Sequence, residues 1–278
     1  MTARDRAELA AARRVVVKVG SSSISADASW RIDAIVEVLA AAHARGVEVV
    51  LVSSGAIATA LPLLRLNGRP DDLATQQASA AVGQNVLMSR YQASLDRFGI
   101  LAGQVLLTAG DLEHPTPRSN ARRAMERLLS LRILPIVNEN DTVATHEIRF
   151  GDNDRLAALV ARLVGADGLV LLSDVESLYT LPPDEPDAEP IRRVRFGDDL
   201  SGYQFGSVVV NSVGTGGAAT KVSAARLAAE AGVGVLVTSA DRVAEALAGE
   251  EIGTWFDPHP NPVPVTPTGS IPTAPGQS

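Results

Sequence analysis

The sequence predicts an α/β protein built on a mostly parallel sheet with helices on both faces. Short apolar runs rich in Val, Ile and Leu recur along the chain and alternate with longer segments of helical spacing. Strands that alternate with helices in this way form parallel sheets, because each helix carries the chain back across the sheet. Polar residues directly follow several of the runs. We therefore expect a ligand site at the edge of the sheet where strands lead into helices.

Composition narrows the class of protein. The 278 residues are 46% hydrophobic, which suffices for a large core, and carry a net charge of -7. This charge argues against a chain-wide nucleic-acid surface, which needs Lys and Arg. The absence of Cys excludes disulfides, thiolate zinc sites and Cys nucleophiles. Charges interrupt residues 1–14 and the apolar stretch 156–172, so we expect no signal peptide, no contact with a membrane and a cytoplasmic protein.

The first strand is expected over residues 14–19, a β-branched run that delivers Lys18 to its end before Gly20 and three serines. Burying an ammonium group without a partner is costly. Lys18 is therefore expected to face an anion such as a phosphate, beside the amides of the Gly and Ser turn. An edge strand with an outward-facing Lys would explain the same residues.

A helix over residues 30–45 and a second strand over residues 48–53 follow. The second strand leads into Ser54 and Gly55 at a helix start. Hydroxyls and a backbone amide at this position can hold an anion or a carboxylate. Plain capping of the helix by Ser explains the same residues equally well.

The middle of the chain continues the alternation. Residues 71–98 predict a long helix, interrupted or kinked near Gly83, and residues 100–107 predict a third strand. Another helix is expected over residues 120–131, and a buried strand over residues 133–137.

Residues 136–154 are the most unusual stretch, because they hold five acids and three Asn and end where a further helix begins. Asn and Asp are ordinary turn residues, so an acidic turn rich in helix caps is the plain interpretation. Two such clusters after a buried strand favour a site for a small charged ligand, in which Asp141 is a natural partner for an ammonium group. The acids are Glu139, Asp141, Glu147, Asp152 and Asp154, and the amides are Asn138, Asn140 and Asn153.

The last third begins with a strand over residues 168–172 that ends in Ser173 and Asp174. Residues 184–199 are interpreted as a surface excursion. The glycine-rich run 213–222 contains Lys221 but matches neither a Walker A motif nor a dinucleotide fingerprint. We expect its glycines to let the backbone approach a ligand. Further elements are expected up to residue 231 (helix) and over residues 233–237 (strand), 242–248 (helix) and 253–256 (strand).

These residues suit phosphoryl transfer, which needs cations on the moving charge and two substrates held in line. Lys18 and Lys221 are the cations. None of the four His residues has triad or metal-ligand spacing. A carboxylate acceptor, with a pKa of about 4.3, is already ionised and needs no base. Acyl-phosphate formation is favoured over alcohol phosphorylation, although an acid of the centre could serve as a base for an alcohol.

Six segments resemble the glutamate 5-kinase branch of the amino acid kinase family and occur in the order which that family uses. They are VVVKVGSSS, VSSGAIA, IVNENDTVAT, IRFGDNDRL, LLSDVESLY and GTGGAATK. The resemblance implies a three-layer αβα sandwich around a mostly parallel sheet. It also implies transfer of the ATP γ-phosphoryl group to the side-chain carboxylate of L-glutamate with Mg²⁺, the first step of proline synthesis.

The resemblance also implies a role for individual residues. Lys18 and Lys221 would stabilise the transferring phosphoryl group, and Asp154 would orient both lysines. The glutamate-binding residues would be Ser54, Gly55, Asp141 and Asn153. ATP would be bound by Lys18, Ser173, Asp174, Thr215, Gly216, Gly217, Ala218, Ala219, Thr220 and Lys221. No residue is expected to be a dedicated metal ligand.

The expected domain layout is an extension over residues 1–13, a catalytic domain over residues 14–257 and a Pro-rich disordered tail over residues 258–278. Many family members carry a small PUA domain in place of that tail. The resemblance further implies feedback inhibition by proline and a homo-oligomer, and a glutamyl phosphate reductase is a conceivable partner. Two alternatives stay open: a kinase for acetylglutamate or aspartate, and a non-catalytic amino-acid sensor.

Overall fold

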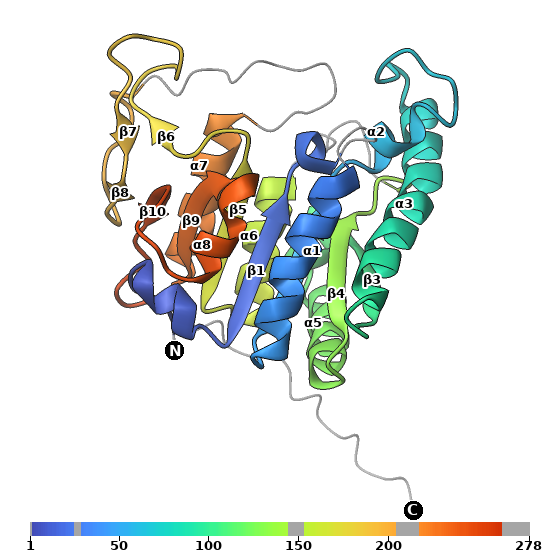
Figure 1. Ribbon diagram of the computed structural model, residues 1–278, viewed down its shortest axis with the longest axis horizontal. Coiled ribbons are helices and arrows are strands. Elements are labelled where there is room, and N and C mark those ends of the chain that lie inside the picture. Colours follow the sequence, from blue (N-terminus) through green and yellow to red (C-terminus); the bar gives the residue numbers. More distant parts are fainter. Residues whose placement is uncertain (1, 25–28, 144–152, 204–216, 263–278) are drawn as a thin grey trace, which may run out of the picture.

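The structure, a computed structural model, describes residues 2–24, 29–143, 153–203 and 217–262 (Figure 1). Its main sheet has eight strands in the order β3-β4-β2-β1-β5-β9-β10-β8. The six strands from β3 to β9 run parallel, β10 is antiparallel to β9, and β8 is parallel to β10. The strands are β1 (Arg14–Val19), β2 (Glu48–Ser53), β3 (Ala102–Leu107), β4 (Leu134–Glu139), β5 (Gly168–Ser173), β8 (Arg193–Val194), β9 (Gly234–Ser239) and β10 (Thr254–Phe256).

Helices cover both faces of this sheet, so the predicted three-layer sandwich is confirmed (Figure 1). One layer contains α1 (Ser29–Ala44), α3 (Leu73–Asp96) and α8 (Val243–Leu247), and the other contains α5 (Pro115–Ser130), α6 (Asn153–Val164) and α7 (Ala218–Glu230). Shorter elements are η1 (Ala7–Ala11), η2 (Ser21–Ile24), α2 (Ala56–Ala60), α4 (Ala109–Glu113), β6 (Leu178–Tyr179), β7 (Pro190–Ile191) and η4 (Ala240–Arg242).

The two cores follow from the alternation of side chains along each strand. Val15 and Val17 of β1 point into the core beneath α1 and α3, whereas Val16 points into the core beneath α6 and α7. β1 lies between β2 and β5, so Lys18 belongs to a central strand. An edge position for Lys18 is thereby excluded.

One predicted feature of the long helix is wrong. α3 runs without interruption from Leu73 to Asp96. Gly83 has a packing role there, because a Cβ atom at this position would lie 1.7 Å from the backbone O of Ala56. The glycine lets α3 lie directly on α2.

The interpretation of residues 184–199 as a surface excursion is also incomplete. This segment supplies β7 and β8, and β8 pairs with β10 at one end of the main sheet. Strands of two residues are too short to show any periodicity, so sequence patterns did not reveal them. Among the described helices, none combines the length and the apolar content that a membrane crossing requires.

Candidate active site

The carboxyl ends of four neighbouring strands, β4, β2, β1 and β5, meet at one edge of the sheet, the upper edge in Figure 1. Lys18 lies one residue before the end of β1, Ser54 and Gly55 follow β2, and Glu139 ends β4. Ser173 ends β5 and Asp174 follows it. Parallel pairing of these strands therefore brings together residues from widely separated parts of the chain, as expected for an open α/β sheet.

Lys18 and Lys221 converge on one carboxylate. Nζ of Lys18 lies 2.7 Å from Oδ1 of Asp154, and Nζ of Lys221 lies 3.4 Å from Oδ2. The Thr220 hydroxyl lies 2.9 Å from Oδ2 of Asp154 and 2.8 Å from the Gly217 carbonyl oxygen, so it can donate to either acceptor. All three charged side chains are buried. The predicted meeting of the two lysines at Asp154 is therefore present in the fold.

The packing of two helices produces this arrangement. Asp154 lies in the first turn of α6 and Lys221 in the first turn of α7, and these two helices pack against each other. Lys221 was expected in a glycine-rich loop, but α7 already begins at Ala218. A helix position fixes the direction of the Lys221 side chain toward Asp154.

The cluster carries an excess of positive charge. Burial alone would raise the pKa of Asp154, but Lys18, Lys221 and their hydrogen-bonding neighbours lower it to about 2. Burial and the nearby charge of Lys18 lower the pKa of Lys221. Among the described residues, Asp154 is the buried carboxylate that pairs with both ammonium groups, and the exposed Asp174 also attracts Lys221. An anion that entered beside them would find an unneutralised charge in a site of low dielectric, where electrostatic attraction is strong.

The turn after β2 is not capped by a serine side chain. Gly55, and not a serine, is the N-cap of α2, and no side chain caps the helix. Gly55 has φ +86°, and a Cβ atom there would lie 2.9 Å from Ile24. The turn after β2 therefore packs directly on η2, beside the end of β1 that carries Lys18. Ser54 is buried at this turn.

Asp141 lines a cavity of about 210 Å³ between α3 and the ends of β3 and β4. Burial, and next the charge of Glu139, raise the pKa of Asp141 to about 7. Asn153 is also buried, and its Oδ1 has no hydrogen-bond partner among the described residues. A buried acceptor of this kind is costly to leave unpaired. The two acids of the cavity, Glu139 and Asp141, suit a ligand that carries an ammonium group.

Residues of the expected nucleotide site lie on the other side of the lysines. Asp174 accepts a hydrogen bond of 2.7 Å from the Ser22 hydroxyl, which ties the turn after β1 to the end of β5. Gly217 is the N-cap of α7, followed by Ala218 and Ala219. Thr215 and Gly216 lie outside the described residues, as do Glu147 and Asp152 of the acidic centre. Among the described residues, no group of three His, Cys, Asp or Glu side chains could hold a metal ion.

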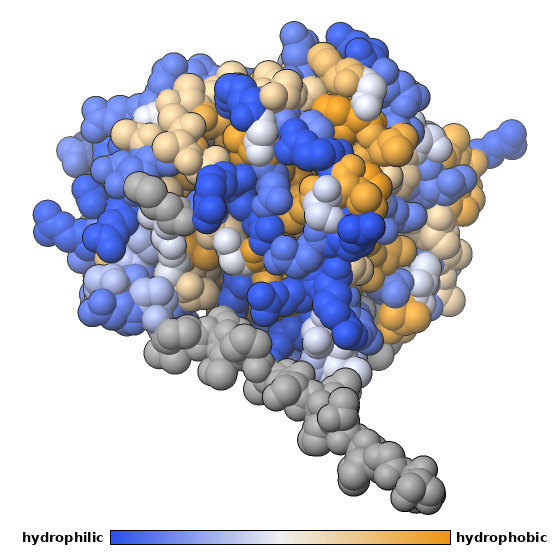
Figure 2. Space-filling view, turned by 90° about the horizontal axis from the view of Figure 1, so that it is seen from below, coloured by the Kyte–Doolittle hydropathy of each residue, from blue (hydrophilic) through white to orange (hydrophobic). Residues whose placement is uncertain are grey.

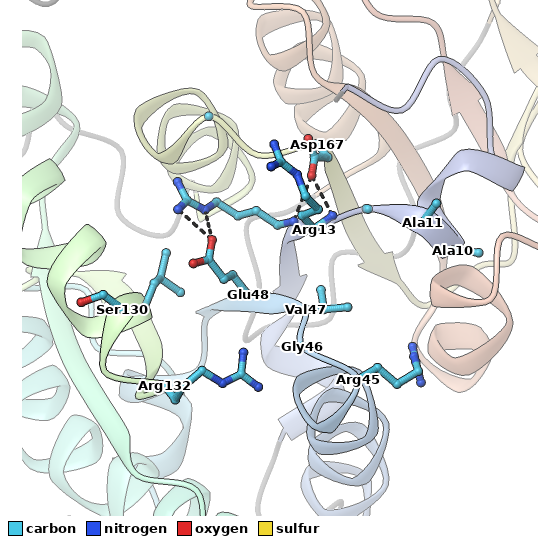
Figure 3. A pocket seen from close by; sticks show the side chains of 14 residues that line it. Ala10, Ala11, Arg13, Arg45, Gly46, Val47, Glu48, Ser130, Arg132 and Asp167 are labelled. Carbon is cyan, nitrogen blue, oxygen red and sulfur yellow. Dashed lines mark hydrogen bonds and ion pairs between the residues drawn. The ribbon is translucent and has the colours of Figure 1, made fainter.

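A larger hollow of about 950 Å³ lies at the opposite end of the strands (Figure 3). Figure 2 shows the face at that end, much of which is hydrophilic. The polar groups of the hollow bind mainly to one another: Arg14 pairs with Glu48 and Glu126, and Asp167 accepts backbone N–H groups of Arg13 and Arg14. These bonds satisfy the start of β1. We therefore assign the hollow a structural role.

Two residues of the site carried no distinctive sequence signal. Gln84 is one of several polar residues in a long helix, and Ser22 is one of three consecutive serines. Only the tertiary arrangement places Gln84 at the cavity of Asp141 and Ser22 beside Asp174. The role of Ser22 was hidden because its partner is 152 residues away.

Comparison with known proteins agrees with this geometry. The sequence model of the amino acid kinase family matches residues 13–239. The chain is 70% identical over 258 residues to a glutamate 5-kinase of Clavibacter sepedonicus, covering 93% of this chain and 99% of that protein. It is 67% identical to a glutamate 5-kinase of Leifsonia xyli subsp. xyli, covering 93% and 96%. A longer relative, a glutamate 5-kinase of Salinispora arenicola, is 55% identical and 70% covered.

Solved structures show a related fold at low sequence identity. Carbamate kinase from Giardia lamblia, bound to AMP-PNP, matches with a TM-score of 0.65 and 17% identity, over 90% of this chain and all of that one. This likeness concerns the fold alone.

Proposed function

The chain belongs to the amino acid kinase family, and from that premise we propose how its site phosphorylates L-glutamate with ATP. The reaction transfers the γ-phosphoryl group to the side-chain carboxylate and yields L-glutamyl 5-phosphate, the first step of proline biosynthesis. The observation that carries the mechanism is the pair of buried lysines that share Asp154.

The lysines act on the charge that moves during transfer. A carboxylate oxygen of glutamate forms a bond to the γ-phosphorus while the bond from that phosphorus to the β,γ-bridging oxygen breaks, and ADP leaves. Negative charge spreads over the phosphoryl oxygens in the transition state. Lys18 and Lys221 hold fixed positive charge there, so little rearrangement is needed as the charge develops. Asp154 positions both ammonium groups.

No proton has to be removed from the acceptor. A free glutamate side chain, with a pKa of about 4.3, is ionised at neutral pH. The chemical requirement is therefore positioning, and the turn at Ser54 and Gly55 beside the end of β1 is suited to the reacting carboxylate. Asp141, which lines the acidic cavity, is suited to the ammonium group, and we assign the buried Asn153 to glutamate binding as well.

ATP would occupy the side of the lysines formed by Ser173, Asp174 and the start of α7, with residues 215–221 around its phosphates. We propose that Mg²⁺ arrives as the ATP complex. This route is chemically reasonable because Mg²⁺ in kinases is held largely by phosphate oxygens and water. The ion supplies charge neutralisation on the phosphates.

The acidic cavity favours glutamate over the substrates of related kinases. Acetylglutamate carries a neutral amide in place of the ammonium group, so nothing on it would offset the repulsion of its α-carboxylate by Asp141 and Glu139. A non-catalytic sensor would not need two buried lysines held 2.7 Å and 3.4 Å from one carboxylate. Aspartate is one methylene shorter, so its ammonium and reacting carboxylate could not span the same two sites.

The proposal also covers the inhibition, the location, the assembly and the partner of the enzyme. Proline would inhibit by occupying the acidic cavity with its own ammonium group. The enzyme would act in the cytoplasm as a homo-oligomer, and its labile acyl phosphate would pass to a glutamyl phosphate reductase.

The test traps the product. Purified enzyme with L-glutamate, MgATP and hydroxylamine should form γ-glutamyl hydroxamate and ADP in equal amounts. Aspartate and acetylglutamate in matched reactions should give little of either. Absence of hydroxamate with glutamate, or higher turnover with acetylglutamate, would refute the assignment.

A further inference from the structure

Within the part of the chain that the structure describes, Gln84 has an unpaired hydrogen-bond donor, and two hydrogen bonds identify which end of its amide this donor is. Its side chain lies on α3, is 7% exposed, and lines the cavity of about 210 Å³ together with Glu139 and Asp141. Nε2 of Gln84 is buried and has no hydrogen-bond partner among the described residues.

The two hydrogen bonds begin at the backbone of β4. The N–H of Glu139 donates to Oδ1 of Asn138 over 2.9 Å, so this oxygen is the acceptor end of the Asn138 amide. Nδ2 of Asn138 must then be the donor in its 2.6 Å bond to Gln84, and Oε1 of Gln84 is the acceptor. Nε2, with its two N–H groups, is then the end of the Gln84 amide that no described residue pairs with.

Packing of α3 holds this donor in place. Gly83, the preceding residue, lies against the backbone of Ala56 at the start of α2. Since α2 begins directly after the turn at Gly55, the same contact connects Gln84 to the turn proposed for the reacting carboxylate. The Gln84 amide cannot withdraw without breaking either this contact or the bond to Asn138.

The cavity needs a ligand that both accepts and donates. Glu139 and Asp141 attract an ammonium group, whereas an unpaired amide donor needs an acceptor. An α-amino acid offers an ammonium and a carboxylate on one carbon atom. We propose that Gln84 binds the α-carboxylate of the glutamate substrate through Nε2, while the ammonium group on the same carbon faces Asp141. This inference rests on the proposed function and assigns the end of the substrate remote from the reacting carboxylate.

Two variants test the donor. In Gln84→Glu one oxygen still accepts from Asn138, but the other presents negative charge to the α-carboxylate at about pH 8. In Gln84→Met the donor is lost without added charge. A hydrogen bond to a charged group supports a rise in the KM for glutamate of roughly 10- to 100-fold. The KM for ATP should stay within about twofold of the wild-type value, a margin set by the modest effect of substitutions outside a contact.

The matched control is Asn85→Asp, which adds the same charge one residue further along α3. Asn85 is exposed at the rim of the same cavity. Its glutamate KM should change much less than that of Gln84→Glu. Equal effects in both variants would attribute the result to general charge repulsion and overturn the inference.

A competitor separates contact with the α-carboxylate from a merely structural role. The α-amide of glutamate keeps the ammonium group and the side-chain carboxylate, but it offers an amide where glutamate has the α-carboxylate. In Gln84→Glu, the ratio of its inhibition constant to the glutamate KM should fall by the factor by which the glutamate KM rises. An unchanged ratio, or a glutamate KM within twofold of wild type in both Gln84 variants, would overturn the inference. Failure of the wild-type enzyme to form the hydroxamate would instead refute the proposed function itself.

Discussion

Asp141 gives the substrate site a pH dependence. Burial and the neighbouring Glu139 raise its pKa to about 7, against a smaller opposing influence of Arg69. A raised carboxyl pKa means that the group is neutral below that pH and charged above it. Only the charged form pairs strongly with an ammonium group, so glutamate affinity should fall as pH decreases through this range.

The measurement is the KM for glutamate between about pH 8 and about pH 6, on either side of the raised pKa. It should increase several-fold toward the lower pH, with the KM for ATP as the internal control. In Asp141→Asn the KM for glutamate should be high and independent of pH. A wild-type glutamate KM that is flat over this range would contradict the assigned pairing.

Asp154 contributes to the stability of the folded protein because it is the counter-charge of the two buried lysines. Asp154→Asn would leave two buried ammonium groups without a counter-charge, which should lower the free energy of unfolding by about 3–5 kcal/mol. The pKa of Asp154 is depressed, so its contribution is present at neutral pH and is lost in strong acid. The stability difference between wild type and variant should therefore narrow as pH falls below about 4.

Denaturant unfolding at several pH values would measure this effect. The double variant Lys18→Met with Asp154→Asn is the matched control, because it removes one uncompensated charge. It should regain part of the stability but none of the activity. If Asp154→Asn were as stable as wild type at neutral pH, the carboxylate would not be the partner of the lysines.

Prediction from sequence at this scale succeeded where a residue is chemically conspicuous. A lysine in a β-branched strand and a dense run of acids each violate the ordinary pattern of a core or a turn, and the structure places Lys18 beside Asp154 and places Glu139 and Asp141 at one cavity. Gln84 obeys the ordinary pattern of a helix, because a single polar residue in a helix of 24 residues is unremarkable. Its significance comes from Asn138, 54 positions away.

At the scale of elements, the crossing of α2 and α3 determines the shape of the substrate side. A Cβ atom at Gly83 would overlap the Ala56 backbone. Gly83→Ala should therefore push the helices apart and destabilise the protein by about 1–3 kcal/mol. Because Gln84 and Gly55 move with these helices, the KM for glutamate should rise as well.

Gly68→Ala is the matched control, since a Cβ atom there would meet nothing within 4 Å. Thermal melting and glutamate kinetics of both variants would decide the matter. Equal melting temperatures in the two variants would show that the helices accommodate the methyl group and that the crossing is not tight.

Element boundaries were predictable to within a few residues for the long strands and helices, because their periodicity is strong. β2 was expected over residues 48–53, where the structure has it. The start of α7 was expected too late, since glycines in residues 214–217 suggested that the loop continued to Lys221. The packing of α7 against α6 stabilises this first turn.

On the scale of the whole molecule, the sheet order puts the two proposed substrate sites on opposite sides of β1. The glutamate side is built from β2, β4 and α3, and the nucleotide side from β5 and α7. Strand order is a property of long-range pairing, so the sequence predicted a parallel sheet but not which strands are neighbours. The chemistry of phosphoryl transfer suggested that Lys18 and Lys221 lie close together. Only the structure shows the distances and the residues that bring them together.

The most direct test of that geometry is the hydroxamate assay on Lys18→Ala and Lys221→Ala at saturating glutamate and MgATP. Loss of one fixed positive charge from the transition state predicts a fall in kcat of about 10²- to 10³-fold for each variant, with the fold intact by circular dichroism. Near-normal kcat in both variants would contradict the claim that these two lysines, joined at Asp154, stabilise the transferring phosphoryl group.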